Sequence, residues 1–327
     1  MMNRGTTPLI EFTAQGMACR RGGFHIDPAR GVDRAIITHA HGDHARPGSR
    51  AYLAHHDSVP LLKLRLGERV HVTGVAYGEP IRMNDVTVSL HPAGHVVGSA
   101  QIRLEAGGEV WVVSGDYKRE NDDVSCPFEP LRCHTFVTEA TFGLPVYRWP
   151  RQEAVYADIN AWWSANAGAG TPSVIQCYAL GKSQRLLRHL DLPIGPVFAH
   201  PAIVQTTRAI NACGRTLPLP AVFSDDDNLP PNACLLSPVI PAHCHWATGA
   251  ASGWMCHGKG RRRNGVDRGF VLSDHADWEG LNQTVRDTQC EAVRVVHGCT
   301  RELSRWLRES GLDASPGYER LEEVVEA

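Results

Sequence analysis

The stretch AIITHAHGDH, residues 35–44, decides both the fold and the chemistry of this chain. A short β-branched run leads into a loop that holds four candidate ligands within six residues: His39, His41, Asp43 and His44. Their nitrogen and oxygen donors suit zinc or a similar metal, and their alternate spacing lets them point toward two ions. The alternative is a polar turn whose histidines cap a helix, but buried imidazoles without partners are costly. The stretch therefore predicts a metal site at the end of a strand.

Other short apolar runs also end in an acidic or imidazole side chain, which is typical of a sheet whose one edge carries the site. Because such runs occur early and late in the sequence, strands from both ends of the chain are expected to meet. The runs are AIIT (35–38) into His39, DVTVSL (85–90) into HPAGH, EVWVV (109–113) into SGDY, TFVT (135–138) into Glu139, FVLS (270–273) into DHADW, and VRVV (293–296) into His297.

Residues 145–264 differ from the segments on either side. They hold strand-then-helix patterns at 172–190 and 195–214, which predict an inserted βα domain. The expected class is α/β, with residues 1–144 and 265–327 forming one discontinuous domain and 145–264 forming the inserted one.

Hydrophobicity, charge and cysteine spacing indicate which kinds of protein this chain can be. The chain has 327 residues, 43% of them hydrophobic, and no run approaches the roughly 18 apolar residues of a membrane helix. The first twenty residues lack a signal core, so a cytoplasmic protein without a membrane partner is expected. The 33 Lys and Arg balance 35 Asp and Glu, so net charge does not by itself indicate nucleic acid. None of the ten cysteines is spaced C-x-x-C, and reduced thiols are expected.

Two further residues extend the ligand set. His95 in HPAGH and Asp116 in SGDY each follow a predicted strand. Alone, His95 could be a core histidine and Asp116 a turn residue, but their order after the 39–44 loop favours ligands. Asp116 is the natural bridge, because a carboxylate can hold two cations about 3.5 to 4 Å apart. Asp27 could brace the ligands by hydrogen bonding from behind them.

The inserted region has its own candidate site. A strand breaks at Gly181 and a helix begins, so the amides of Gly181, Lys182, Ser183 and Gln184 could bind a phosphate of the substrate, with Lys182 or Ser183 adding contacts. The alternative is an ordinary glycine turn before a helix.

Two other features are better explained by structure than by substrate binding. A basic stretch could line an entry channel, but a solvated loop is the more common role of such a charge run; it consists of Lys259, Arg261, Arg262, Arg263 and Arg268. Trp162 and Trp163 could stack on bases, although an amphipathic packing face is favoured.

These residues carry a family resemblance that covers almost the whole chain. The 39–44 loop with His95 and Asp116 resembles the metallo-β-lactamase fold, and Glu139, His275 and His297 resemble the three extra motifs of the β-CASP nucleases. The resemblance implies a metallo-β-lactamase αββα sandwich with an inserted β-CASP α/β domain. Four segments are similar to the small bacterial ligase-associated exonucleases of the DNA damage response: PAGHVVGSAQ (92–101), VSGDYK (113–118), TEATFGLPVYRWP (138–150) and GFVLSDHADW (269–278).

The resemblance also implies roles for the residues. Two divalent ions, zinc or alternatively manganese, share a hydroxide that attacks phosphorus. His275 corresponds to the general acid and Glu139 to the carboxylate that orients it, and Asp43 counts among both the ligands and the catalytic residues. The implied ligand sets are His39, His41, His95 and Asp116 for one ion, and Asp43, His44, Asp116 and His297 for the other.

The implied function is a DNA exonuclease of DNA repair that works in the same pathway as a DNA ligase and a helicase. His297 keeps an RNA-processing ribonuclease of the mRNA 3′-end type open, because such members carry His there whereas Artemis-type DNA nucleases carry Val. A small-molecule metallo-hydrolase and a non-catalytic binding subunit are the remaining alternatives. The complete ligand set and the motifs at Glu139 and His275 weigh against both.

Overall fold

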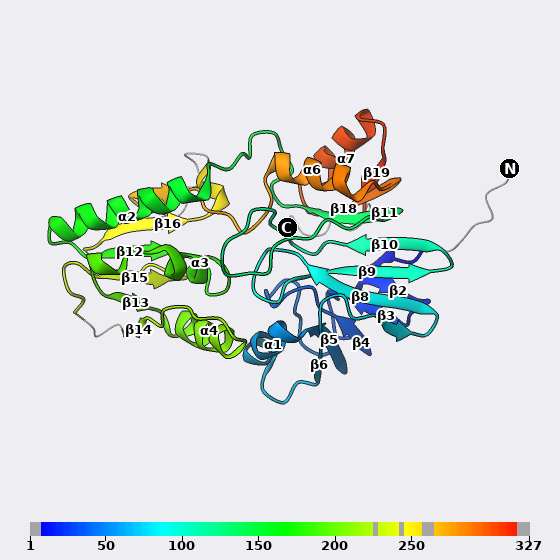
Figure 1. The fold of residues 1–327 in the computed structure, drawn as a ribbon, viewed down its shortest axis with the longest axis horizontal. Helices are drawn as coiled ribbons and strands as arrows, with labels where there is room; N and C mark the ends of the chain where they lie inside the picture. The colour runs from blue at the N-terminus through cyan, green and yellow to red at the C-terminus, as the bar shows by residue number, and fades with distance from the viewer. Residues whose placement is uncertain (1–7, 225–227, 242–244, 257–264, 319–327) are drawn as a thin grey trace.

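The computed structural model describes residues 8–224, 228–241, 245–256 and 265–318. Its strands form three sheets with helices packed on them, which confirms the expected α/β class (Figure 1). Among the residues in these ranges, no helix has the length and apolar character needed to cross a bilayer.

The first sheet has six strands in sequence order. β1 to β3 pair antiparallel, and β3 to β6 pair in parallel. The strands are β1 (Glu11–Thr13), β2 (Gly16–Cys19), β3 (Phe24–Ile26), β4 (Arg34–Ile36), β5 (Ala51–His55) and β6 (Val72–Val75).

The second sheet has seven strands in the order β19-β18-β11-β10-β9-β8-β7. β18 pairs in parallel with β11, which confirms that strands from both ends of the chain meet. The strands are β7 (Ile81–Met83), β8 (Val86–Pro92), β9 (Ala100–Ala106), β10 (Glu109–Val113), β11 (Thr135–Ala140), β18 (Ala292–Gly298) and β19 (Asp313–Pro316).

These two sheets share one apolar core, in which Ile26 and Ile36 of the first sheet lie in the same cluster as Ile102 and Val137 of the second. The outer face of the first sheet is covered by α1 (Val59–Leu66), which η1 (His56–Ser58) precedes. The outer face of the second is covered by α6 (Trp278–Thr288) and α7 (Thr300–Glu309). Leu303 and Leu307 of α7, one turn apart, are both buried in that layer.

The third sheet is entirely parallel, in the order β14-β13-β15-β12-β16-β17. In Figure 1 it lies to the left of the other two sheets, with α4 beside α1. Its elements are α2 (Gln152–Gly168), β12 (Ser173–Gln176), α3 (Lys182–His189), η2 (Leu192–Ile194), β13 (Val197–Ala199), α4 (Pro201–Ala212), β14 (Ala221–Val222), β15 (Cys234–Ser237), β16 (Ala247–Ala251), η3 (Gly253–Cys256) and β17 (Arg268–Phe270).

The strand-then-helix patterns expected in this region are confirmed. β12 and α3 fall within 172–190, and β13 and α4 fall within 195–214. The packing role expected for the tryptophans is also confirmed, because Trp163 is fully buried and Trp162 packs edge-on against Phe270.

One predicted strand is wrong. Residues 270–273 were expected to form a strand beside the others that carry the site, but β17 ends at Phe270 and pairs with β16 in the third sheet. The chain leaves the sheet there because the buried Arg185 guanidinium donates to the Ser273 carbonyl, at 2.6 Å, and to the Asp274 carboxylate, at 2.8 Å. Of the basic stretch, Lys259, Arg261, Arg262 and Arg263 lie outside the described residues, whereas Arg268 lies on β17 and pairs with Asp158 at 2.5 Å.

Candidate metal centre and active site

Three histidines and one aspartate converge next to the loop between β12 and α3 of the third sheet. His41 Nδ1 lies 3.1 Å from His39 Nε2 and 3.1 Å from His95 Nε2. Asp116 Oδ2 lies 3.6 Å from His39 Nε2 and 3.8 Å from His95 Nε2. One donor atom of each residue thus falls within 4.8 Å of the others. The structure brings together the four residues predicted for the first metal.

In His41 and His95, the ring nitrogen that points away from the cluster forms a hydrogen bond, and this bond shows which nitrogen carries the proton. His41 Nε2 lies 3.1 Å from the Leu180 carbonyl oxygen, and His95 Nδ1 lies 2.8 Å from that of Asp274. A carbonyl only accepts, so both outer nitrogens donate. Burial lowers the pKa of both imidazoles, which are therefore neutral. His41 Nδ1 and His95 Nε2 then face each other with lone pairs at 3.1 Å, an arrangement that a cation between them stabilises.

A second group of donors lies on the other side of Asp116. His44 Nε2 is buried without a hydrogen bond in the described structure, 3.3 Å from Asp116 Oδ2 and 3.8 Å from Asp43 Oδ2. The His44 ring centre lies 5.0 Å from that of His297. Burial alone would lower the pKa of His44, but the carboxylates of Asp116 and Asp27 outweigh burial and raise that pKa well above its usual value. Asp43, His44 and His297 thus lie near Asp116, and their role as ligands of a second metal stays a prediction.

Two residues of this group have backbones in the left-handed region, Asp27 at φ 42° and His297 at φ 56°. Such conformations cost a non-glycine residue about 1 to 3 kcal/mol and are held only where the surroundings determine them. Asp27 Oδ2 accepts from His44 Nδ1 at 2.7 Å, and both Asp27 oxygens accept from Thr38. Asp27 therefore fixes the His44 ring from behind, in the geometry expected of it.

Asp116 is common to both groups. Burial by itself would raise the pKa of its carboxyl group, but the imidazoles of His44 and His275 outweigh burial and hold the pKa well below its usual value. Asp116 is therefore a carboxylate, as a ligand requires.

Glu139, which is buried, and His275, which is half-buried, form a pair beside Asp116. His275 Nδ1 lies 3.0 and 2.9 Å from the two Glu139 oxygens. Those oxygens also accept from the Tyr117 amide at 2.8 Å and from Thr141 Oγ1 at 2.5 Å, so the carboxylate is fixed on β11. Burial lowers the pKa of His275, but Glu139 and Asp116 reverse that effect and raise the pKa to about 9. At neutral pH His275 thus carries a proton that it can give away.

At the start of α3, groups that were expected to be free to bind a phosphate already have partners within the protein. The Gly181 amide donates to Gln184 Oε1 at 2.8 Å, and Ser183 Oγ donates to the Ala179 carbonyl at 3.0 Å. Lys182 Nζ is bound to Asp274 Oδ2 at 2.6 Å. These partners lie within the protein, so the substrate-binding role of residues 181–184 stays a prediction.

A cavity of about 800 Å³ opens above the metal centre. His41, Asp43 and His275 line it from one side. Tyr178 and Trp254, which the sequence analysis did not single out, line it from the third sheet. Asp274 was missed as well, although its position beside His275 in SDHADW was a signal that could have found it.

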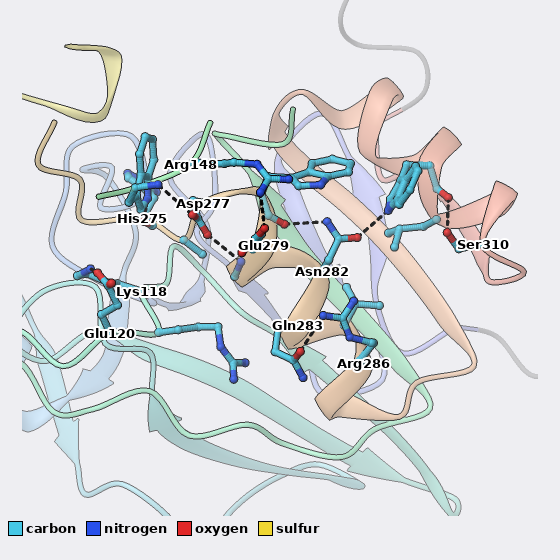
Figure 2. A pocket seen from close by; sticks show the side chains of 18 of the residues that line it. Lys118, Glu120, Arg148, His275, Asp277, Glu279, Asn282, Gln283, Arg286 and Ser310 are labelled. Atoms are coloured by element: carbon cyan, nitrogen blue, oxygen red, sulfur yellow. Dashed lines mark hydrogen bonds and ion pairs between the residues drawn. The ribbon is translucent and has the colours of Figure 1, made fainter. Parts of the chain in front are cut away.

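A second cavity of about 860 Å³ also reaches His275, along the exposed side of α6 (Figure 2). Its charged residues are mostly paired with each other: Arg148 with Glu279 at 2.5 Å, and Lys118 with Glu120 at 2.6 Å. Figure 2 shows His275 at one end of this cavity. His275 therefore stands between the two hollows.

No protein-family model matches the chain. It is 30% identical over 311 residues to a protein of Opitutus terrae named a probable DNA ligase, a match that covers 92% of this chain and 30% of the relative. A ribonuclease of Thermus thermophilus is 27% identical over 207 residues, 54% of this chain and 47% of its own length. Cleavage and polyadenylation specificity factor subunit 3 of Dictyostelium discoideum is 27% identical over 121 residues, 36% of this chain and 15% of its own length. These similarities fit the resemblance to the β-CASP nucleases that the motifs of the chain carry.

The chain spans less than half the length of each of these relatives. A solved structure of a protein of unknown function from Enterococcus faecalis superposes with a TM-score of 0.57 at 11% identity, covering 83% of this chain and 76% of the other. That likeness concerns the fold alone. The three β-CASP motif residues lie around one centre, Glu139 on β11, His297 on β18 and His275 in the loop before α6.

Proposed function

We propose that this β-CASP protein is a metal-dependent nuclease that hydrolyses phosphodiester bonds of nucleic acid. One observation carries the proposal: the facing lone pairs of His41 and His95 lie next to Asp116, and Asp116 lies within 4.8 Å of the Glu139–His275 pair. A cation-binding centre and a protonated imidazole at one point are the two components that phosphodiester hydrolysis requires.

The residues fit two divalent cations, as the facing lone pairs of His41 and His95, and the position of His44 Nε2 beside the Asp116 and Asp43 carboxylates, indicate. When bound, the cations would supply Lewis acidity that lowers the pKa of a water and neutralises charge on the phosphoryl oxygens. Imidazole and carboxylate donors favour zinc, with manganese the alternative. The proposed sets are His39, His41, His95 and Asp116 for one cation, and Asp43, His44, Asp116 and His297 for the other.

His275 is proposed as the general acid. Its Nδ1 proton is held by Glu139, so the Nε2 proton is the one available to the leaving oxygen as the P–O bond breaks. Glu139 keeps the ring protonated and oriented, and its own contacts with Tyr117 and Thr141 keep the carboxylate still.

We also propose a specific fold and a division into domains. The four layers formed by α1, two sheets, and α6 with α7 support the metallo-β-lactamase αββα sandwich. Residues 1–144 and 265–327 would form this domain, and 145–264 would form the inserted β-CASP domain. β17 extends the inserted sheet just beyond that boundary.

The proposed substrate is DNA, and the proposed role is that of an exonuclease in DNA repair in the cytoplasm, in one pathway with a DNA ligase and a helicase. Alignment along almost the whole chain with a protein named a probable DNA ligase supports DNA and the ligase. RNA is the second candidate, because the Thermus thermophilus relative is named a ribonuclease.

The test is cleavage of end-labelled single-stranded DNA and RNA by the purified protein, with and without a chelator. Asp43→Ala should abolish cleavage, because it removes a proposed ligand. Asp33→Ala is the matched control: Asp33 is equally exposed, at 68% against 66%, and pairs only with Arg50. Cleavage that survives the chelator or the Asp43 change would refute the proposal. The ratio of DNA to RNA cleavage decides between the substrates.

A further inference from the structure

Three large apolar side chains stay exposed around the cavity above the metal centre. In the described chain, Leu64, Tyr178 and Trp254 line this cavity and are 45%, 62% and 49% exposed. Exposed aromatic rings grouped beside a candidate active site mark a binding surface more often than scattered ones do. Tyr178 and Trp254 therefore need a functional explanation.

Both rings project from one edge of the third sheet. β12 and β16 are parallel neighbours, with Gln176 opposite Ala250. Tyr178 follows the end of β12, and Trp254, in η3, follows the end of β16. Since the carboxyl ends of parallel strands meet at one edge, the two rings are presented together, toward the cavity that the metal ligands line from the other side.

Each ring is supported from behind. Lys182 Nζ lies 4.5 Å from the centre of the Tyr178 ring, and Asp274 holds that ammonium group in turn. Trp254 packs on Phe142, with ring centres 4.8 Å apart, and meets Tyr147 edge-on at 5.8 Å. Supported but exposed rings lose little conformational entropy when a flat ligand stacks on them.

Among the described residues that line the cavity, the basic side chains do not form a continuous electrostatic track. Its acidic lining residues are Asp43, Asp116 and Asp274, whereas its basic ones are Arg65, Lys182 and the protonated His275, which Glu139 holds. Arg65 donates to the Ala40 carbonyl at 2.9 Å, and Lys182 is paired with Asp274. Away from the bound cations, a nucleic-acid strand gains little here from phosphate contacts.

We infer that Tyr178 and Trp254 are stacking platforms for unpaired bases of the substrate strand. The inference rests on the proposed nuclease function and names how its substrate is selected. Stacking accepts every base, because each has a π face, but it requires bases that are not paired in a duplex. The strand is therefore single-stranded where it crosses the cavity, and its sequence matters little.

The experiment measures binding without turnover. The anisotropy of fluorescein-labelled oligothymidylate and of an abasic strand of equal length is followed in His275→Ala protein carrying Trp254→Ala or Tyr178→Ala. Each change should weaken oligothymidylate binding by roughly 5- to 150-fold and leave abasic binding unchanged. Trp254→Phe and Tyr178→Phe keep a ring and should retain most of the affinity. Trp306→Ala, which removes a ring that is 45% exposed and lies outside this cavity, is the matched control.

Equal affinities for oligothymidylate before and after the alanine changes would overturn the inference, as would equal losses on the abasic strand. The proposed function is judged separately, by metal-dependent cleavage in the protein without these changes. If cleavage is present and the stacking effect is absent, only the inference fails. If cleavage is absent, the proposed function fails, and the binding data still decide whether the rings stack on bases.

Discussion

His95 Nδ1 donates a hydrogen bond of 2.8 Å to the backbone carbonyl of Asp274, 179 residues later in the chain. The Asp274 carboxylate is at the same time bound to Lys182 at 2.6 Å and to Arg185 at 2.8 Å, and all three groups are buried. The position of a proposed metal ligand thus depends on a buried ion network between α3 and the loop before α6.

Asp274→Ala should therefore destabilise both the fold and the metal centre. It leaves two buried cations without their carboxylate, and breaking a buried ion pair in this way costs about 3 to 5 kcal/mol. Urea unfolding measures the loss, and metal content after dialysis measures the effect on the site. Asp267→Ala is the control, because Asp267 is exposed and bonds only to Thr248. A stability equal to that of the control would contradict the role of the network.

His275→Ala should keep its metal and lose turnover. General acid catalysis contributes typically about 10²- to 10⁴-fold, so the cleavage rate should fall by that factor while metal content stays at the level of the unchanged protein. Atomic absorption and single-turnover cleavage are measured on the same samples. Metal loss would instead make His275 a ligand.

Glu139→Gln should shift the alkaline limb of the pH–rate profile. Glu139 raises the pKa of His275, and the acid form of that imidazole is lost as pH rises through this pKa. Removing the negative charge lowers the pKa, so activity should begin to fall at a lower pH than in the unchanged protein. The profile of kcat/KM with a single-stranded substrate is the measurement. An alkaline limb that does not move would show that His275 is not the titrating acid.

Asp27→Asn should weaken the second cation site without abolishing folding. Asp27 accepts from His44 Nδ1 at 2.7 Å and so fixes the tautomer that leaves Nε2 free for a metal. Changes in such supporting carboxylates typically lower metal affinity about 10- to 100-fold. Competition with a chromophoric chelator gives the affinities of the two metal-binding steps. Only the step in which His44 binds its cation should become weaker. An unchanged pair of affinities would remove Asp27 from the centre.

The sequence predicted the residues of the site better than the path of the chain around it. The loop at 39–44, His95 and Asp116 were recognisable because ligand types followed apolar runs at short intervals, and the structure brings them together. The strand at 270–273 was wrong because its apolar letters resemble a sheet strand, whereas the contacts of Ser273 and Asp274 with Arg185 pull the chain out of the sheet. Arg185 lies 88 positions before Ser273 and 89 positions before Asp274, so no local sequence pattern predicts these contacts.

The roles of single aromatic residues were equally hidden. Trp162 and Trp163 fall in a helical pattern and were predicted to pack, which the structure confirms. Tyr178 and Trp254 lie after strand ends without any periodicity around them. Their exposure beside a cavity follows only from the parallel pairing of β12 with β16.

The hydrogen bonds from His41 to Leu180 and from His95 to Asp274 both cross from the ligand loops to the opposite wall. Separation of these segments would free the two imidazoles that are proposed to bind the same ion. A cation that needs both rings in place would therefore also stabilise the contacts with Leu180 and Asp274, so its binding would tie together parts of the chain far apart in sequence.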